Sequence, residues 1–306
     1  MASTSEIRRR IGSVRQTQKI THAMYLISQA KLRKAKQDLS NTRPYFDALQ
    51  TEIGRVFNAD SSIESRYLMP EDANARPLPG VAACLLITAD KGLAGAYNQN
   101  AIRQAQQFLA ANEGAELYVV GEYGRRWFSQ RGIPIEKSFL YTAQNPTMQR
   151  AREITAELLD RFDKGELQKI FVIYTDMKNS LTENVSATRI LPFHRSAFTA
   201  PTDEKRITEP FEFFPSVTQV LENIVPSYVS GFIYSALIDS FCSEQSARMN
   251  AMNSANENAE KMLGELALAY NRIRQAAITQ EITEVSAGAR AQKRKRQKQH
   301  AQGRES

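Results

Sequence analysis

The sequence predicts two long terminal helices that pair as an antiparallel coiled coil, with an open α/β domain inserted between them. Three observations support this fold class. Apolar residues follow helical spacing from about residue 4 to residue 57. Short apolar runs then alternate with helical segments from residue 81 to about residue 200. A heptad repeat with no proline after Pro226 occupies the C-terminal quarter of the 306-residue chain.

The first predicted segment, residues 1–57, contains a helix that begins near residue 4. Hydroxyl side chains at its start can cap it, and Glu6 favours the positive end of the helix dipole. Polar Gln18 and Thr21 interrupt its apolar seam, and Pro44 is expected to kink or break the helix near Arg43. The seam consists of Ile7, Ile11, Val14, Ile20, Met24, Ile27 and Ala30.

Residues 58–80 contain three prolines and few apolar positions, which predicts a linker. Residues 81–200 form the predicted α/β domain. Its expected strands are VAACLLIT, LYVVG, KIFVIYTD and VSATRILPF, and helical segments separate the first three. Strands that alternate with helices favour a mostly parallel sheet with helical cover.

Residues 201–226 contain four prolines and are predicted to form a linker, or foot segment, between the α/β domain and the C-terminal helix. The C-terminal helix is then expected at 227–288, a rod of roughly 95 Å if helix continues to residue 290. A helix of this length cannot bury its row of apolar side chains on a compact domain, so it needs the helix at 4–57 as its partner. Its seam has steps of three and four: Met252, Ala255, Ala259, Met262, Leu266, Ala269, Ile273 and Ala276.

The net charge of +7 is unevenly distributed. Residues 7–36 carry nine basic side chains and no acid, and the tail 289–306 has seven basic residues and one acid. The rest of the chain therefore has a net charge of −8. Nucleic-acid binding is one interpretation of the basic segments, but residues 7–36 offer no aromatic stacking residue besides Tyr25. A membrane-surface helix would need a bulkier apolar face.

The sequence predicts no catalytic residues, no cofactor and no metal site in this chain. There is no GxxxxGK[ST] motif, and the turn GLAGAY lacks the GxGxxG pattern. The histidines His22, His194 and His300 lie far apart, and neither Cys84 nor Cys242 belongs to a CxxC pair. The chain contains no apolar run near the roughly 18 residues of a membrane span, and MASTSEIRRR has no apolar signal core.

Three stretches resemble one family. IRRRIGSVRQTQKITHAMYLISQAKLRKAK is similar to the N-terminal signature of the gamma subunit of F-type ATP synthases. SALIDSFCSEQSARMNAMNSANENAEKMLGELALAYNRIRQAAITQEITEV is similar to its C-terminal signature, and ITADKGLAGAYN resembles its turn after the first strand. The resemblance implies a coiled-coil axle with an inserted Rossmann-like domain, acting as a central rotor stalk. This noncatalytic subunit would couple ion flow through a membrane rotor ring to ATP synthesis or hydrolysis on the beta subunits.

The resemblance also implies partners and contact residues. The partners would be the alpha, beta, epsilon and delta subunits and the rotor ring. The chain would lie at the cytoplasmic face of a bacterial membrane and would reach that membrane only through the complex. It would make no direct contact with nucleic acid. Met24 would be an axle contact, and Glu209 would contact the ring. The other axle contacts would be Arg274, Gln275, Thr279 and Glu281. The basic tail 289–306 departs from the family, and a free nucleic-acid-binding or scaffold coiled coil is the competing hypothesis.

Overall fold

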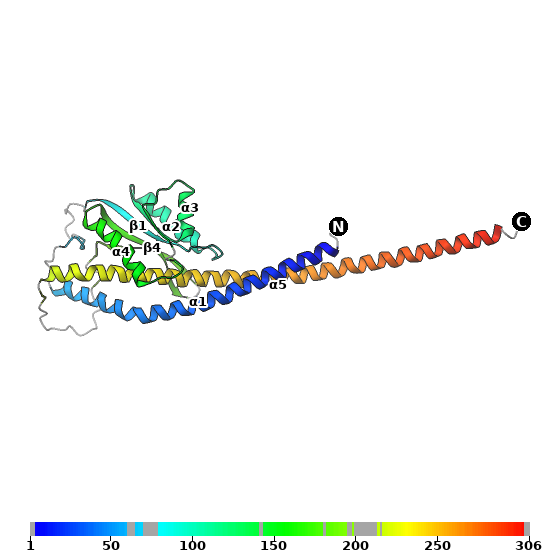
Figure 1. The fold of residues 1–306 in the computed structure, drawn as a ribbon, viewed down its shortest axis with the longest axis horizontal. Coiled ribbons are helices and arrows are strands. Elements are labelled where there is room, and N and C mark those ends of the chain that lie inside the picture. Colours follow the sequence, from blue (N-terminus) through cyan, green and yellow to red (C-terminus); the bar gives the residue numbers. More distant parts are fainter. Residues whose placement is uncertain are drawn as a thin grey trace. The chain divides into compact units, whose positions relative to one another are not determined.

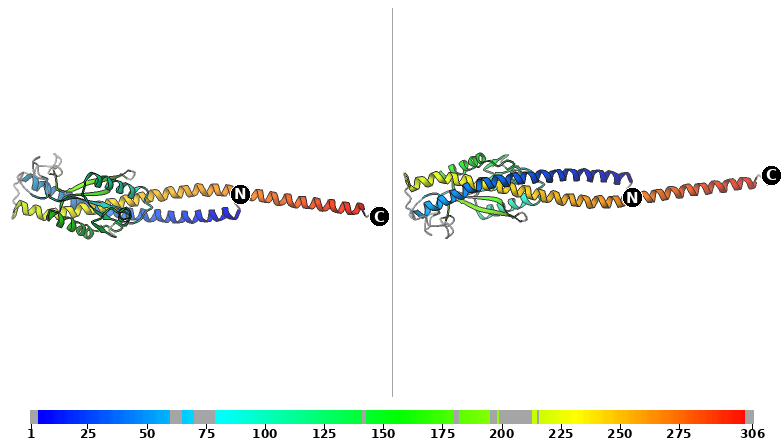
Figure 2. Two further views of the ribbon diagram at one scale, coloured as in Figure 1. Left: turned by 90° about the horizontal axis from the view of Figure 1, so that it is seen from above. Right: turned by 90° about the horizontal axis from the view of Figure 1, so that it is seen from below.

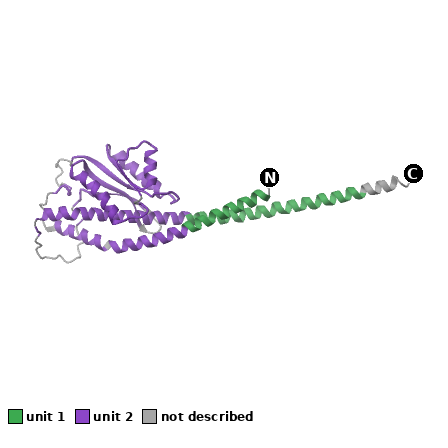
Figure 3. Ribbon diagram, viewed as in Figure 1, with its two compact units in different colours: residues 1–24, 252–306 green, residues 25–251 purple. Residues whose placement is uncertain are grey.

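The computed structural model describes residues 4–59, 65–69, 79–140, 143–179, 182–194, 198, 213–214 and 216–302. The chain divides into two compact units (Figure 3). Unit 1 comprises residues 1–24 and 252–306, and unit 2 comprises residues 25–251. Two long helices, α1 (Thr4–Ala59) and α5 (Val217–Gln302), contribute to both units. The predicted fold class, α/β with paired long terminal helices, is confirmed.

Unit 1 is an antiparallel helix pair, in which residues 4–24 of α1 run beside α5 (Figure 2). Arg8 Nη2 donates to the Tyr270 hydroxyl at 3.1 Å, and the Thr21 hydroxyl bonds to the Asn256 amide oxygen. The guanidinium of Arg8 also lies 5.8 Å from the centre of the Tyr270 ring. Residue numbers rise along one helix as they fall along the other, so the pairing is antiparallel.

The seam of unit 1 differs from the predicted one. Ile20 and Met262 were expected in it, but they are 55% and 48% exposed. On α1, the predicted Ile7, Ile11 and Val14 do turn inward, and they are joined by Gln18 and Thr21. Their steps of four and three continue one heptad without interruption, so the polar pair belongs to the seam and does not break it. The heptad position of a residue, and not its apolar character, therefore decides which α1 side chains face α5, and Ile20 stays exposed.

Unit 2 contains a five-stranded sheet with the order β3-β2-β1-β4-β5 (Figure 1). The strands are β1 (Val81–Ile87), β2 (Glu116–Val120), β3 (Lys137–Phe139), β4 (Leu167–Asn179) and β5 (Thr182–Leu191). β1 pairs in parallel with both β2 and β4, β2 pairs in parallel with β3, and β5 is an antiparallel edge strand on β4. The three-residue strand β3 was not predicted.

Helices cover both faces of this sheet (Figure 1). The helices α2 (Tyr97–Ala111) and α3 (Glu122–Ser129) pack on one face, where Cys84 and Leu86 point. On the other face, Leu85 and Ile87 meet α4 (Met148–Asp163) and parts of α1 and α5. Successive side chains of a strand point to opposite faces, so β1 supplies both cores and its side chains from Ala83 to Ile87 are buried.

The two prolines in the long helices do not end them. Pro44 lies inside α1 and Pro226 lies inside α5, which begins at Val217 and not at residue 227 as predicted. Close packing holds this region together, because a Cβ built on Gly231 would lie 1.9 Å from Cε1 of Phe46. One stretch of α5 is apolar enough to cross a membrane by length and composition, but 61% of it is buried inside the structure, as in a core helix.

Polar contacts bind α5 to the sheet within unit 2. The Ser243 hydroxyl donates to the Thr175 carbonyl of β4 at 3.2 Å. Arg248 forms an ion pair with Glu244 at 2.5 Å and donates to the Gly92 carbonyl at 3.1 Å. Burial raises the pKa of the Glu244 carboxyl, and the charge of Arg248 opposes that shift. The turn after β1 is thereby attached to α5.

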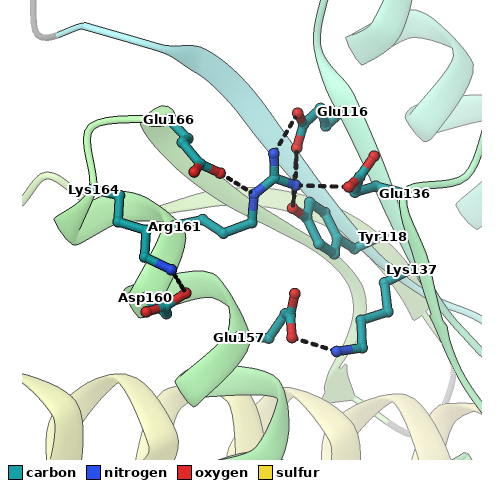
Figure 4. A network of polar contacts seen from close by, with 9 residues as sticks. All are labelled: Glu116, Tyr118, Glu136, Lys137, Glu157, Asp160, Arg161, Lys164 and Glu166. Atoms are coloured by element: carbon teal, nitrogen blue, oxygen red, sulfur yellow. Dashed lines mark hydrogen bonds and ion pairs between the residues drawn. The ribbon is translucent and has the colours of Figure 1, made fainter.

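A second polar network joins the start of three strands to the end of α4 (Figure 4). The Arg161 guanidinium forms ion pairs with Glu116 at 2.7 Å, Glu166 at 2.8 Å and Glu136 at 3.1 Å. It also donates to the Tyr118 hydroxyl at 2.5 Å. Burial and the nearby Glu116 carboxylate raise the pKa of Tyr118. One cation therefore compensates three carboxylates at this end of the sheet.

Candidate functional site

The candidate site is the end of α5 that continues past the helix pair of unit 1. The two hydrogen-bonded pairs, Arg8 with Tyr270 and Thr21 with Asn256, have residue numbers that add to 278 and 277. This register places residue 273 opposite the first described turn of α1. Farther along α5, the described part of the chain offers no facing helix. Residues 274–293 are accordingly exposed on every side.

An apolar stripe runs along this exposed segment. Ile278, Ile282 and Val285 are 46%, 61% and 68% exposed. Their steps of four and three place them on one face of the helix. This stripe was not predicted, because polar residues occupy most positions of the region, although its spacing is visible in ITQEITEV. A row of large apolar side chains in water is the usual mark of a surface that another protein covers.

The predicted contacts Arg274, Gln275, Thr279 and Glu281 lie on the same exposed segment. The polar side chains here form short-range bonds along the helix: the Thr279 hydroxyl donates to the Gln275 carbonyl at 2.9 Å, and Gln280 donates to Glu284 at 2.9 Å. Their outward groups thus surround the stripe. Four of the predicted contacts are brought together in this way.

The other two predicted contacts do not belong to this segment of α5. Met24 is partly buried and lies three residues after Thr21 on α1, close to the level of the Thr21–Asn256 hydrogen bond. Arg274 lies 18 residues beyond Asn256, about 27 Å along the helix, so Met24 belongs to a separate level of unit 1. Glu209, the predicted foot contact, lies outside the described residues.

The basic face of α1 is exposed in both units. In unit 1, Arg9, Arg15 and Lys19 lie outside the seam, and in unit 2 the same holds for Arg33 and Lys34. Cations on the outer face of a helix pair stay in water, where each ion pair with an external partner would contribute only about 0–1 kcal/mol. Such a face suits contacts that form and break readily.

Possible metal ligands are dispersed over the described residues, and both cysteines are buried. Across them, no group of three or more His, Cys, Asp or Glu side chains is placed to hold a metal ion. Cys84 and Cys242 are 0% and 1% exposed, and burial raises the pKa of both thiols, that of Cys242 to about 12. Thiols with such pKa values are poor nucleophiles at neutral pH.

Comparisons with known proteins agree with this geometry. A family model described as ATP synthase matches residues 3–292. The ATP synthase gamma chain of Caldanaerobacter subterraneus subsp. tengcongensis is 42% identical over 296 residues, which cover 93% of this chain and 98% of the relative. The ATP synthase gamma chain of Ruminiclostridium cellulolyticum is 39% identical, with 94% and 97% covered. A chain in a Euglena gracilis mitochondrial ATP synthase structure has a TM-score of 0.63 at 15% identity, with 94% of both chains covered, which bears on the fold alone. The chain therefore belongs to the ATP synthase gamma chain family.

Proposed function

We propose that this chain is the central rotor stalk subunit of an F-type ATP synthase. It couples ion flow through a membrane rotor ring to ATP synthesis or hydrolysis by rotating inside a hexamer of alpha and beta subunits. The chain itself is noncatalytic, and the chemistry takes place on the beta subunits. The observation that carries the proposal is the end of α5, where residues 274–293 are exposed on every side and bear an apolar stripe. A helix of this kind is suited to being enclosed by other proteins.

Rotation converts the asymmetry of the axle into different states of the catalytic subunits. On one face of α5 the stripe Ile278, Ile282 and Val285 is apolar, whereas Arg274 and Glu281 present charge around it. Each surrounding subunit therefore meets a different surface at a given angle. A contact that is more favourable to one state of a subunit shifts its population toward that state. Weak exposed ion pairs, such as those that Arg15 and Lys19 of α1 would form with acidic groups of the surrounding subunits, allow these contacts to break at each step.

The remaining partners follow from the same proposal. The epsilon and delta subunits join the assembly, and the foot around Glu209 contacts the rotor ring. The chain is then a peripheral protein at the cytoplasmic face of a bacterial membrane. Membership in the ATP synthase gamma chain family supports this assignment, since the family model extends over residues 3–292.

Co-expression with alpha and beta subunits of the same organism tests the proposal. We expect a complex whose ATPase activity depends on this chain. Replacing Ile278 and Ile282 by Asp places charge on the apolar stripe and is expected to lower assembly or ATPase activity at least tenfold. The matched control, Gln280→Asp, changes the polar face of the same turn and is expected to assemble normally. A fully active complex that contains the double variant would refute the role of the stripe.

The polar contacts are tested in the assembled enzyme. Arg274→Ala and Glu281→Ala are expected to leave assembly intact and to lower the ATP made per ion translocated, because each removes a contact made during rotation. ATP synthesis and the ion flow that drives it, measured on the same vesicles, report this ratio. Unchanged coupling in both variants would remove these residues from the proposed contact set.

A further inference from the structure

The C-terminal end of α5 continues beyond the region that the family shares. The family model ends at residue 292, whereas the helix continues to Gln302. These ten further residues add about 15 Å to the helix. Residues 290–298 contain six basic residues and no acid: Arg290, Lys293, Arg294, Lys295, Arg296 and Lys298. We call residues 290–302 the basic extension.

The basic extension follows directly on the apolar stripe of the same helix. Continued in steps of four and three, the heptad position of Ile278, Ile282 and Val285 is next occupied by Ala289, Gln292 and Arg296. Arg290 lies five residues past Val285, about 7.5 Å along the helix, and Lys298 lies about 20 Å past it. Along the sequence of this one helix, the apolar stripe is therefore followed within about three turns by a run of basic residues. A protein that covers the stripe must meet these cations at the edge of its contact.

We propose that the basic extension binds an acidic surface on the same protein assembly that covers the apolar stripe. This inference rests on the proposed function, in which that assembly is the hexamer of alpha and beta subunits. Protein interfaces commonly have an apolar centre and a polar rim, and the order of residues along α5 has this form. The partner surface beyond the stripe is accordingly rich in Asp and Glu, and it stabilises the cations that repel one another at spacings of four residues.

The composition of the extension disfavours the other polyanions. Residues 289–306 contain no Phe, Tyr, Trp, Leu, Ile, Val or Met, so the segment has no side chain to insert into a lipid surface. They also contain no Phe, Tyr or Trp to stack on single-stranded bases. Binding to duplex nucleic acid through phosphate contacts alone needs neither apolar nor aromatic side chains. The experiment must therefore distinguish binding to duplex nucleic acid from binding to an acidic protein surface.

The experiment compares three versions of the full chain assembled with alpha and beta subunits. The first version has the natural sequence. In the second, neutral version, the six basic residues of 290–298 are replaced by Gln. In the third version, the control, each Arg of that set is replaced by Lys and each Lys by Arg, so the charge is kept. The rate at which the chain leaves the hexamer is measured at 0.05 M and 0.5 M NaCl. The neutral version is expected to leave about 10–100-fold faster at low salt. At high salt, where screening acts within about 4 Å, the difference should fall below about threefold. The control should behave as the natural sequence.

Three results would overturn the inference. If the neutral version leaves the hexamer as slowly as the natural chain at low salt, the extension makes no acidic contact, and the proposed function still stands. If no version assembles, both the inference and the proposed function fail. If the isolated natural chain binds a 30-base-pair DNA duplex more tightly than it binds the hexamer at the same salt, and the neutral version does not, the partner is nucleic acid.

Discussion

Replacing Arg161 by Ala removes the cation that joins the end of α4 to the sheet. The guanidinium contacts Glu116, Glu136 and Glu166 and donates to Tyr118 (Figure 4). The Arg161 side chain is 17% exposed and that of Glu116 is 23% exposed, while the other two carboxylates are 49% exposed. The substitution therefore leaves one largely buried carboxylate and two half-exposed ones without their cation.

The magnitude follows from this difference in exposure. Breaking a fully buried ion pair by removing one partner costs about 3–5 kcal/mol. The Glu116 pair is two-pronged, with nitrogen–oxygen distances of 2.7 and 2.9 Å, but it is still partly hydrated. We therefore assign it about 2 kcal/mol, and the half-exposed pairs about 0–1 kcal/mol each. Arg161→Ala should lower the free energy of unfolding of unit 2 by about 2–4 kcal/mol.

Urea unfolding, followed by tryptophan fluorescence, measures this change, since Trp127 is the single tryptophan and lies in α3 of the same unit. Arg161→Lys keeps the charge but cannot form the two-pronged contact, so it should show an intermediate loss. Lys164→Ala is the matched control, because its partner Asp160 lies on the same helix end and both side chains are mostly exposed. The reasoning is refuted if Arg161→Ala unfolds at the same urea concentration as Lys164→Ala.

Three further predictions concern packing and titration. A Cβ on Gly54 would lie 2.5 Å from the Phe198 carbonyl oxygen, so Gly54→Ala should cost about 1–3 kcal/mol in urea unfolding. Gly264→Ala, with nothing within 4 Å, should instead stabilise its helix by about 0.5–1 kcal/mol, and equal effects would contradict the packing argument. Burial and a hydrogen bond to a carboxylate raise the pKa of Tyr67 to about 12. Because this pKa lies above the ordinary value near 10, the stabilisation is complete below pH 10 and is lost as the pH rises through 12. The rise in absorbance at 295 nm near pH 12, to which Tyr228 also contributes, should be smaller in Tyr67→Phe. A smaller rise near pH 10 would contradict this. Burial raises the pKa of Cys242 to about 12, so iodoacetamide at pH 8 should modify it only after unfolding, and rapid native labelling would contradict this.

The fold was largely predictable because its signals are long or repeated. The strands β1, β2 and β4 each contain a continuous apolar run, and the heptads of α1 and α5 extend over many turns. The strand β3, with sequence KSF, is too short to show a period. Pro44 was predicted to kink or break α1; the helix is not broken there, because a neighbouring residue packs on α5 and tertiary contacts outweigh local propensity.

The site was predicted only in part, for two physical reasons. Polar Gln18 and Thr21 hold seam positions because the heptad register places them there, and Thr21 also bonds to Asn256; residue polarity alone reveals neither. The exposure of Ile278, Ile282 and Val285 depends on where the facing helix ends, and this is a property of the pairing register. The Arg161 network joins residues separated by 45 and 25 positions, so no local pattern predicts it.

The stripe on α5 has a consequence for how the cell must produce this protein. Until partner subunits cover it, a newly made chain presents Ile278, Ile282 and Val285 to water and to other copies of itself. Such patches promote aggregation, and an isolated helical end is readily opened and cut by proteases. Surplus chains should therefore be short-lived, and the supply of alpha and beta subunits would set how many copies survive. The same residues that would serve a moving machine would then act as a check on its stoichiometry.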